Sequence, residues 1–195
     1  MIGDLGAHDA QVHDQPREQA GAIRDFWFAL TPEEHFAKSE ALDVTIATRF
    51  GAWRDAALAS GAAGWRDDPQ TLLAAIILLD QFSRNIHRGT AEAFAADPLA
   101  LSLTHDAIAR GWDGDYTDDE RVFLYLPLMH AEDATTQDLC VEKYAALGRE
   151  NNLAFARDHR TVIQRFGRFP GRNDALGRDS SDAERRYLEE TGGGW

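Results

Sequence analysis

Apolar residues recur along this chain at the three- and four-residue spacing of amphipathic helices. The last long stretch of this kind places Val162, Ile163 and Phe166 on one side of a helix. Asn-Gly hairpin turns and long runs of alternating apolar and polar residues, which would predict strands, do not occur in the sequence. The pattern therefore predicts an all-α fold of about eight helices with short connections, which we place over residues 17–30, 40–60, 69–83, 98–110, 118–130, 135–147, 151–166 and 181–190.

Capping residues mark the ends of several of these helices. Thr117 stands three residues before Glu120, and Ser181 stands three residues before Glu184. In this arrangement two side chains bond the free N–H groups of a first helical turn. Every residue of the segment 72–79 is apolar, so we expect the helix that contains it to be central and covered by other helices on most sides.

The length and composition of the chain suit a single domain. Its 195 residues are 44% hydrophobic, which is enough for one sizeable core and little for two full domains. We expect residues 17–190 to form this helical domain. The polar residues 1–16 are expected to form a mobile tail, and residues 191–195, which include three successive glycines, a flexible C-terminal end.

The net charge is strongly negative. Thirty-three acidic and 20 basic residues give a formal charge of −13. This charge argues against non-specific binding to nucleic acid or to an anionic membrane surface, because both need a positively charged protein surface. The start of the chain does not resemble a signal peptide, and its apolar runs are much shorter than the roughly 20 residues that span a bilayer. We therefore expect a soluble, cytoplasmic protein.

The chain has one cysteine, Cys140, which excludes an intrachain disulfide and a metal site built from several cysteines. Cys140 falls on an apolar stripe with Tyr144 and Leu147, so a buried packing role is expected for it. The histidines and acids show no zinc-protease spacing. Neither a metal nor a cofactor is predicted.

Three short polar segments concentrate arginine, histidine and carboxylate where helices are expected to end. They cover residues 84–89, 129–133 and 165–173. Helix ends can present polar groups to a ligand or to another part of the chain. These segments are therefore the candidates for a functional site.

The first segment continues the central helix. Asp80 and Arg84 stand four residues apart, which favours an ion pair on one helix face, and Gln81 and Asn85 have the same spacing. Arg84 and Arg88 are also four residues apart, so their guanidinium groups could converge on a carboxylate or phosphate of a ligand. The alternative is a structural ion pair that fixes the loop.

The second segment contains His130, Glu132 and Asp133. One imidazole and two carboxylates within four residues could supply an acid–base pair or part of a metal site. The competing interpretation is that Glu132 or Asp133 caps the start of the next helix, while His130 bonds carbonyl groups at the end of the preceding one.

The third segment carries several arginines around a Phe-Gly-Arg-Phe-Pro-Gly turn, namely Arg165, Arg168 and Arg172, with His159 in the helix before it. The phenylalanines indicate that this loop is packed against the domain. A packed loop with several arginines needs either an anionic ligand or acidic partners. We expect such partners among Glu120, Glu132 and Asp133, and a pairing of Arg168 with Glu132 in particular.

These segments resemble those of the bacterial proteins known as domain of unknown function 924 (DUF924). The resemblance covers about residues 20–190 and depends most on the runs 78–85, 120–127, 130–133 and 165–173. Ser83, Ala131 and Gly171 depart from the family's usual proline, serine and histidine. The resemblance implies a fold of stacked antiparallel helix pairs similar to tetratricopeptide repeats. It implies no activity, because the family has none that can be carried over.

Three functions stay open from the sequence. The first is binding of a small anionic metabolite in a polar pocket formed by the candidate residues Arg84, Asn85, Arg88, His130, Glu132, Asp133, His159, Arg165, Arg168 and Arg172. The second is a protein-interaction module whose concave groove holds a peptide or a partner helix. In the third, the polar segments form a structural network of hydrogen bonds and ion pairs. The sequence does not decide whether the protein is an enzyme.

Overall fold

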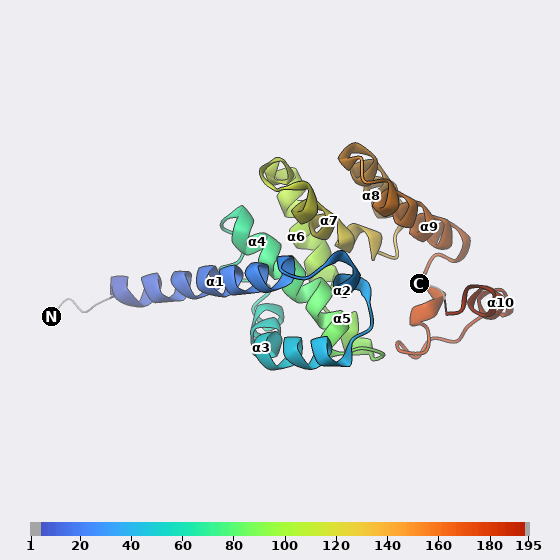
Figure 1. Cartoon of the computed structure of the whole chain (residues 1–195), viewed down its shortest axis with the longest axis horizontal. Coiled ribbons are helices and arrows are strands. Elements are labelled where there is room, and N and C mark those ends of the chain that lie inside the picture. The colour runs from blue at the N-terminus through green and yellow to red at the C-terminus, as the bar shows by residue number, and fades with distance from the viewer. Residues whose placement is uncertain (1–4, 194–195) are drawn as a thin grey trace.

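Helices make up the regular structure of the computed structural model, which describes the backbone of residues 5–193 and the side chains of residues 16–193 (Figure 1). The α-helices are α1 (Leu5–Phe28), α2 (Pro32–Phe36), α3 (Glu40–Ala59), α4 (Pro69–Ile76), α5 (Ser83–Ile86), α6 (Asp97–Ala109), α7 (Asp118–Met129), α8 (Ala134–Leu147), α9 (Glu150–Phe166) and α10 (Asp182–Thr191). A π-helical segment, η1 (Ile77–Phe82), joins α4 to α5, and the 3₁₀ turns are η2 (Ala91–Ala93), η3 (Trp112–Asp115) and η4 (Pro170–Arg172). The prediction of an all-α fold with about eight helices is confirmed.

Most helix ends lie within a few residues of the predicted ones. The main difference is α1, which begins at Leu5 and so takes in much of the segment 1–16 that we expected to be a tail. The short α2 was not among the predicted helices, although its Thr31 cap is plain in the sequence. Residues 1–4 and 194–195 lie outside the described part of the chain, and the mobility of the two ends stays a prediction.

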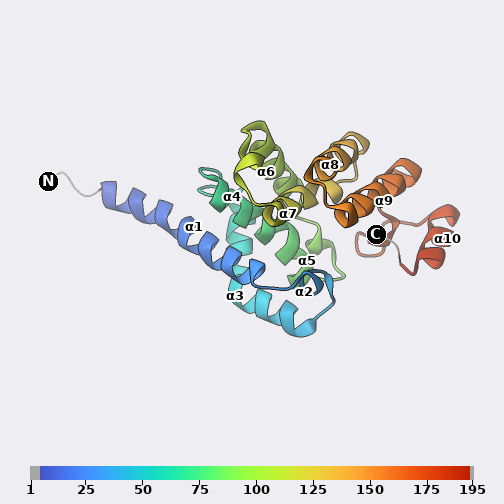
Figure 2. The same ribbon diagram turned by 45° about the horizontal axis from the view of Figure 1, so that its top comes forward.

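Neighbouring helices stack along the molecule. Helix α1 packs on α4, and α3 packs on η1 and α5. Further along the chain α6 contacts α7, α7 contacts α8, and α8 contacts α9. Figures 1 and 2 show α8 and α9 side by side, with α10 at the end of the molecule opposite to the start of α1. None of the described helices is long and apolar enough to span a membrane.

The segment from α4 into η1 lies at the centre of the core, as predicted. All eight residues 72–79 are buried. The ring of Phe82 extends this core, with its centroid 5.4 Å from that of Trp27 and 4.9 Å from that of Phe50. Burial of each such side chain contributes about 1.5–3 kcal/mol. A second, smaller core of Val162, Ile163 and Phe169 holds the C-terminal loop against α9.

The π-helical turn places polar residues inside this apolar helix. Asp80 and Gln81, which lie within η1, are both buried. A π-helical turn inserts one extra residue into the helix and is common at functional sites. The two polar side chains therefore need partners from the surrounding helices.

The C-terminal end of α7 is held by a buried amide. Gln137 of α8 is fully buried, and its side-chain nitrogen donates to the carbonyl oxygens of Met129 at 2.7 Å and of Ala131 at 2.9 Å. These carbonyls lie beyond the last helical hydrogen bonds of α7, where they lack partners within the helix. Gln137 thus fixes the segment that carries His130.

Replacing Gln137 by Ala should lower the free energy of unfolding by about 2–3 kcal/mol, because buried carbonyl groups lose their donor. Urea denaturation followed by circular dichroism measures the change. The control is Gln70→Ala, at an exposed position in the first turn of α4, which should change stability by less than about 0.5 kcal/mol. Equal stabilities of the two variants would contradict the role assigned to Gln137.

Candidate functional site

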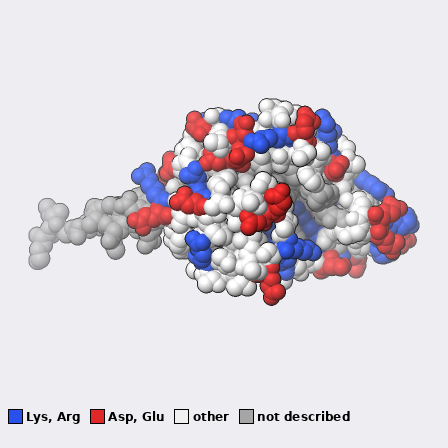
Figure 3. Space-filling model, viewed as in Figure 1, with Lys and Arg blue, Asp and Glu red and all other residues white. Residues whose placement is uncertain are grey.

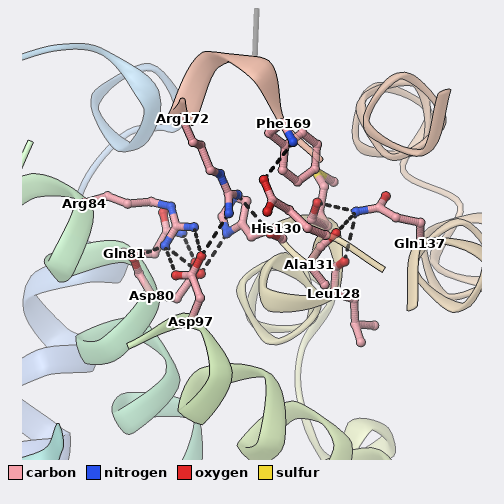
Figure 4. Close-up of polar contacts among 12 residues, drawn as sticks. Asp80, Gln81, Arg84, Asp97, Leu128, His130, Ala131, Gln137, Phe169 and Arg172 are labelled. Carbon is pink, nitrogen blue, oxygen red and sulfur yellow. Dashed lines mark hydrogen bonds and ion pairs between the residues drawn. The ribbon is translucent and has the colours of Figure 1, made fainter. Parts of the chain in front are cut away.

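Asp80 is the centre of a buried polar network (Figure 4). Its side chain is 1% exposed. One carboxylate oxygen lies 2.7 Å from Nδ1 of His130 and 3.0 Å from Nη1 of Arg84, and the other accepts a hydrogen bond from the side-chain amide of Gln81 at 2.5 Å. Burial opposes ionisation, but the charge of Arg84 and the bonds from His130 and Gln81 outweigh it and hold the pKa of Asp80 well below its ordinary value.

A second carboxylate, Asp97 at the start of α6, joins two arginines. Arg84 donates to both oxygens of Asp97, at 2.9 and 3.0 Å. Arg172, from η4, lies 3.3 Å from Asp97 and donates to the backbone carbonyl of His130 at 2.9 Å. Burial and the nearby charge of Arg84 lower the pKa of Arg172 to about 10. Two arginines and two carboxylates thus neutralise each other here, and they connect η1, α5, α6, α7 and η4.

The bond to Asp80 fixes the tautomer of His130. An ionised carboxylate only accepts hydrogen bonds, so Nδ1 of His130 carries the proton. Burial and the charge of Arg84 lower the pKa of His130, which keeps the ring neutral. Its Nε2 therefore bears a lone pair. Within the described residues this atom has no hydrogen-bond partner, and it is not sealed away from solvent.

His130 lines an apolar cavity of about 390 Å³ between α2, α7 and α9. The residues around it are Phe36, Leu126, Met129, His130, Asn152, Phe155 and His159. Phe36 and Phe155 are 61% and 49% exposed, which is unusual for such large apolar side chains. Figure 3 shows a hollow on this face of the molecule, to the right of its centre.

His159 brings a second imidazole to the cavity. The centroid of its ring lies 6.5 Å from that of His130. Nδ1 of His159 is 2.8 Å from the backbone carbonyl oxygen of Phe155, which can only accept, so this nitrogen carries the proton. Burial, and the proximity of His130, lower the pKa of His159 to about 3. Both rings are therefore neutral at physiological pH.

The structure brings Arg84, His130, His159 and Arg172 together. The side chain of Arg88, in contrast, has a different partner from that of Arg84. Arg88 donates to both oxygens of Asp43 in α3, at 2.8 Å each, and Asn85 donates to the same carboxylate at 2.7 Å. Arg84 and Arg88 therefore do not converge on one anion, and the alternative of structural ion pairs describes both residues. In the structure Asn85 and Arg88 hold α5 against α3.

The acids of the second segment have different roles. Asp133 is the N-cap of α8, where it accepts a bond from the backbone N–H of Thr136, so the capping interpretation is confirmed for this residue. Glu132 pairs with Arg178, at 2.7 and 2.9 Å, and accepts a bond from the backbone N–H of Phe169. These bonds hold the loop after α9 against the end of α7.

The expected pairing of Arg168 with Glu132 is wrong. Arg168 donates instead to both oxygens of Glu184 in α10, at 2.7 and 2.9 Å. Arg165 stacks on the ring of Phe166, 4.6 Å from its centroid. Neither Arg165 nor Arg168 lines the cavity next to His130, because both lie at the junction of α9 with α10.

Several residues of the site carried no distinct signal in the sequence. Asp97 precedes a proline, a pattern that indicates a helix start, and the sequence around Arg178 does not indicate a partner for it. Phe36, Met129 and Asn152 lie in three different helices, so their meeting at one cavity depends on the tertiary fold. No group of three or more His, Cys, Asp or Glu side chains suited to a metal ion is found among the described residues.

The model of a family described as "bacterial protein of unknown function (DUF924)" matches residues 23–192. The chain belongs to this family. The resemblance seen in the polar segments is thereby confirmed.

One solved structure shares the fold over its whole length. It is that of a protein of unknown function, ATU0120, from Agrobacterium tumefaciens. The two are 42% identical, with a TM-score of 0.85, and the match covers 89% of this chain and 98% of the other. No match is found among functionally curated proteins, so the comparisons assign the family and fold without an activity.

A double-mutant cycle on Glu132→Ala and Arg178→Ala should give a coupling of about 1–3 kcal/mol, because the pair is bidentate and largely buried. The measurement is the free energy of unfolding of the single and double variants. The matched control is the cycle on Glu132→Ala and Arg168→Ala, which should give less than about 0.5 kcal/mol. A larger coupling in the second cycle would contradict the pairing described above.

The stability of the protein should fall as the pH is lowered from about 6.5, the ordinary pKa of histidine. Between that pH and the pKa of about 3 in the folded protein, His159 binds a proton only in the unfolded state. One such histidine reduces the free energy of unfolding by up to about 1.4 kcal/mol per pH unit. Below about pH 4.5, where carboxyl groups of the unfolded chain begin to bind protons, the lowered pKa of Asp80 and of Glu132 adds to the loss.

Urea denaturation between pH 7 and 5 tests this dependence. His159→Leu should show a shallower loss than the unchanged protein, whereas His105→Gln, at an exposed position on α6, should keep the full slope. If His159→Leu and the unchanged protein lose stability equally over this range, His159 does not have the lowered pKa.

Proposed function

We propose that this protein binds a small organic molecule in the cavity between α2, α7 and α9. The apolar part of the ligand would lie against Phe36, Met129 and Phe155, and its polar end would face His130 and His159. The observation that carries this proposal is a cavity of about 390 Å³ that combines exposed aromatic walls with two neutral imidazoles. Ligand sites are commonly apolar concavities with a few fixed polar groups.

The electrostatics of the site favour a neutral or an anionic ligand. Among the described residues no Asp or Glu lines the cavity, so none of these side chains would compensate a cation. The low pKa of His130, caused by burial and by the charge of Arg84, indicates that positive charge is disfavoured at this position. The arginines would not contact an anion directly, since Arg84 and Arg172 already pair with carboxylates. Their effect on the ligand would be indirect, because the charge of Arg84 lowers the pKa of His130.

The alternative function is binding of a protein segment. Phe36 and Phe155 stay exposed at the cavity, and an apolar side chain of a partner could enter between them. The remaining arginines do not support an extended recognition groove, because Arg88 and Arg168 are each paired within the domain. A single small cavity fits a small molecule better than a peptide.

The fluorescent probe 8-anilinonaphthalene-1-sulfonate, an aromatic anion, should bind the natively folded protein in this cavity. Phe155→Ala should weaken its affinity about fivefold, because a phenyl ring that is partly covered by a ligand contributes about 1 kcal/mol. Fluorescence titration measures the dissociation constant. Native mass spectrometry of the purified protein should in addition detect a small molecule on the unchanged protein and less of it on Phe155→Ala.

The matched control is Val44→Ala, which truncates an apolar side chain that is 59% exposed and does not line the cavity. Its affinity for the probe should equal that of the unchanged protein. Equal affinities of Phe155→Ala and Val44→Ala would contradict the proposal.

A further inference from the structure

We propose that Asp80 and His130 form a general acid–base pair, and that the protein hydrolyses carboxylic esters with an apolar acyl or aryl group bound in the cavity. This inference rests on the proposed function, because the substrate is the ligand of that cavity. His130 would be the catalytic residue, and Asp80 would be a positioning residue that acts through it.

The orientation of His130 is what a general base requires. Its Nδ1 lies 2.7 Å from a buried carboxylate, which fixes the ring and places the lone pair on Nε2. Three further groups hold the carboxylate and the histidine in place. Arg84 and Gln81 bond to Asp80, and Arg172 bonds to the backbone carbonyl of His130. A base held in this way can take a proton without a loss of alignment.

The composition of the cavity wall indicates which reaction this base could assist. No serine, threonine or cysteine lines the cavity in the described part of the chain, so the wall there offers no hydroxyl or thiol nucleophile. Cys140 is buried, and burial raises the pKa of its thiol to about 12. In the proposed reaction water is the nucleophile, and Nε2 of His130 receives its proton. Asn152, on the same face of α9 as Phe155 and His159, supplies an amide donor for a carbonyl oxygen.

The proposed step balances without a further reactant. Nε2 of His130 takes a proton from water while the water oxygen forms a bond to the ester carbonyl carbon. The carbonyl π electrons move onto its oxygen, which the amide of Asn152 stabilises, and Asp80 stabilises the imidazolium. Collapse of the tetrahedral intermediate breaks the bond to the leaving alcohol, which takes the proton from Nε2. The products are one carboxylic acid and one alcohol, and His130 returns to its initial state.

The charges around His130 set the pH dependence of this step. The ring faces Asp80 from η1, Arg84 from α5, Asp97 from α6, His159 from α9 and Arg172 from η4. Burial and Arg84 lower the pKa of His130, whereas Asp80 and Asp97 partly oppose this shift. Because protonation of Nε2 removes the base, kcat/KM should fall on acidification, with a midpoint below the ordinary histidine value of about 6.5.

Hydrolysis of 4-nitrophenyl acetate by the full-length protein tests the proposal. Release of nitrophenolate should exceed the rate in buffer, and His130→Gln should lower kcat/KM on the order of a hundredfold, the usual contribution of a general base. The control His105→Gln removes an exposed histidine far from the cavity and should keep the rate of the unchanged protein. Asp80→Asn should lower kcat more than it raises KM, since Asp80 does not line the cavity.

The binding of 8-anilinonaphthalene-1-sulfonate, measured on the same variants, separates the two proposals. If the probe binds His130→Gln with nearly unchanged affinity while hydrolysis is lost, the acid–base role is supported. If the unchanged protein binds the probe but hydrolyses the ester no faster than His130→Gln does, the acid–base role is overturned and the binding function stands. If the unchanged protein does not bind the probe, the binding function fails.

The pH profile of the unchanged protein needs no variant. A hydrolysis rate that is independent of pH between 4 and 8 would also overturn the inference.

Discussion

A carboxylate that has to remain ionised inside the core organises this molecule. Asp80 lies in the central, largely apolar helix, where an unpaired charge would cost several kcal/mol. The fold meets this requirement by bringing Arg84, Gln81 and His130 to its two oxygens. Arg84 then needs a second anion, which Asp97 provides. The packing of the central helix against α6 and α7 is thus coupled to one buried charge.

The same requirement determines what the protein offers to a ligand. His130 must turn Nδ1 towards Asp80, which leaves its other nitrogen without a hydrogen-bond partner among the described residues, and the residue lines the apolar cavity. The C-terminal loop supports this orientation from outside the core, since Arg172 bonds to the carbonyl of His130 and Glu132 is held by Arg178. A structural network and a candidate site are therefore not alternatives here, because the network is what holds the imidazole at the cavity.

The sequence predicts the helices well because their ends depend on local chemistry. The capping boxes at Thr117 and at Ser181 are both present in the structure. Pairings between distant segments could not be predicted, since any of the acids could in principle serve any of the arginines. The π-helical turn around Asp80 has no local sequence signal either. The cavity was missed because its apolar residues, such as Phe36 and Met129, follow the same spacing as residues of the core.

The protonation state of His130 tests the central claim most directly. The ¹⁵N chemical shifts of its two ring nitrogens distinguish the tautomers and the charged form. At neutral pH the account predicts a neutral ring with the proton on Nδ1 and a bare Nε2, held by Asp80. A ring that is charged, that carries its proton on Nε2, or that exchanges rapidly between the two tautomers would contradict it.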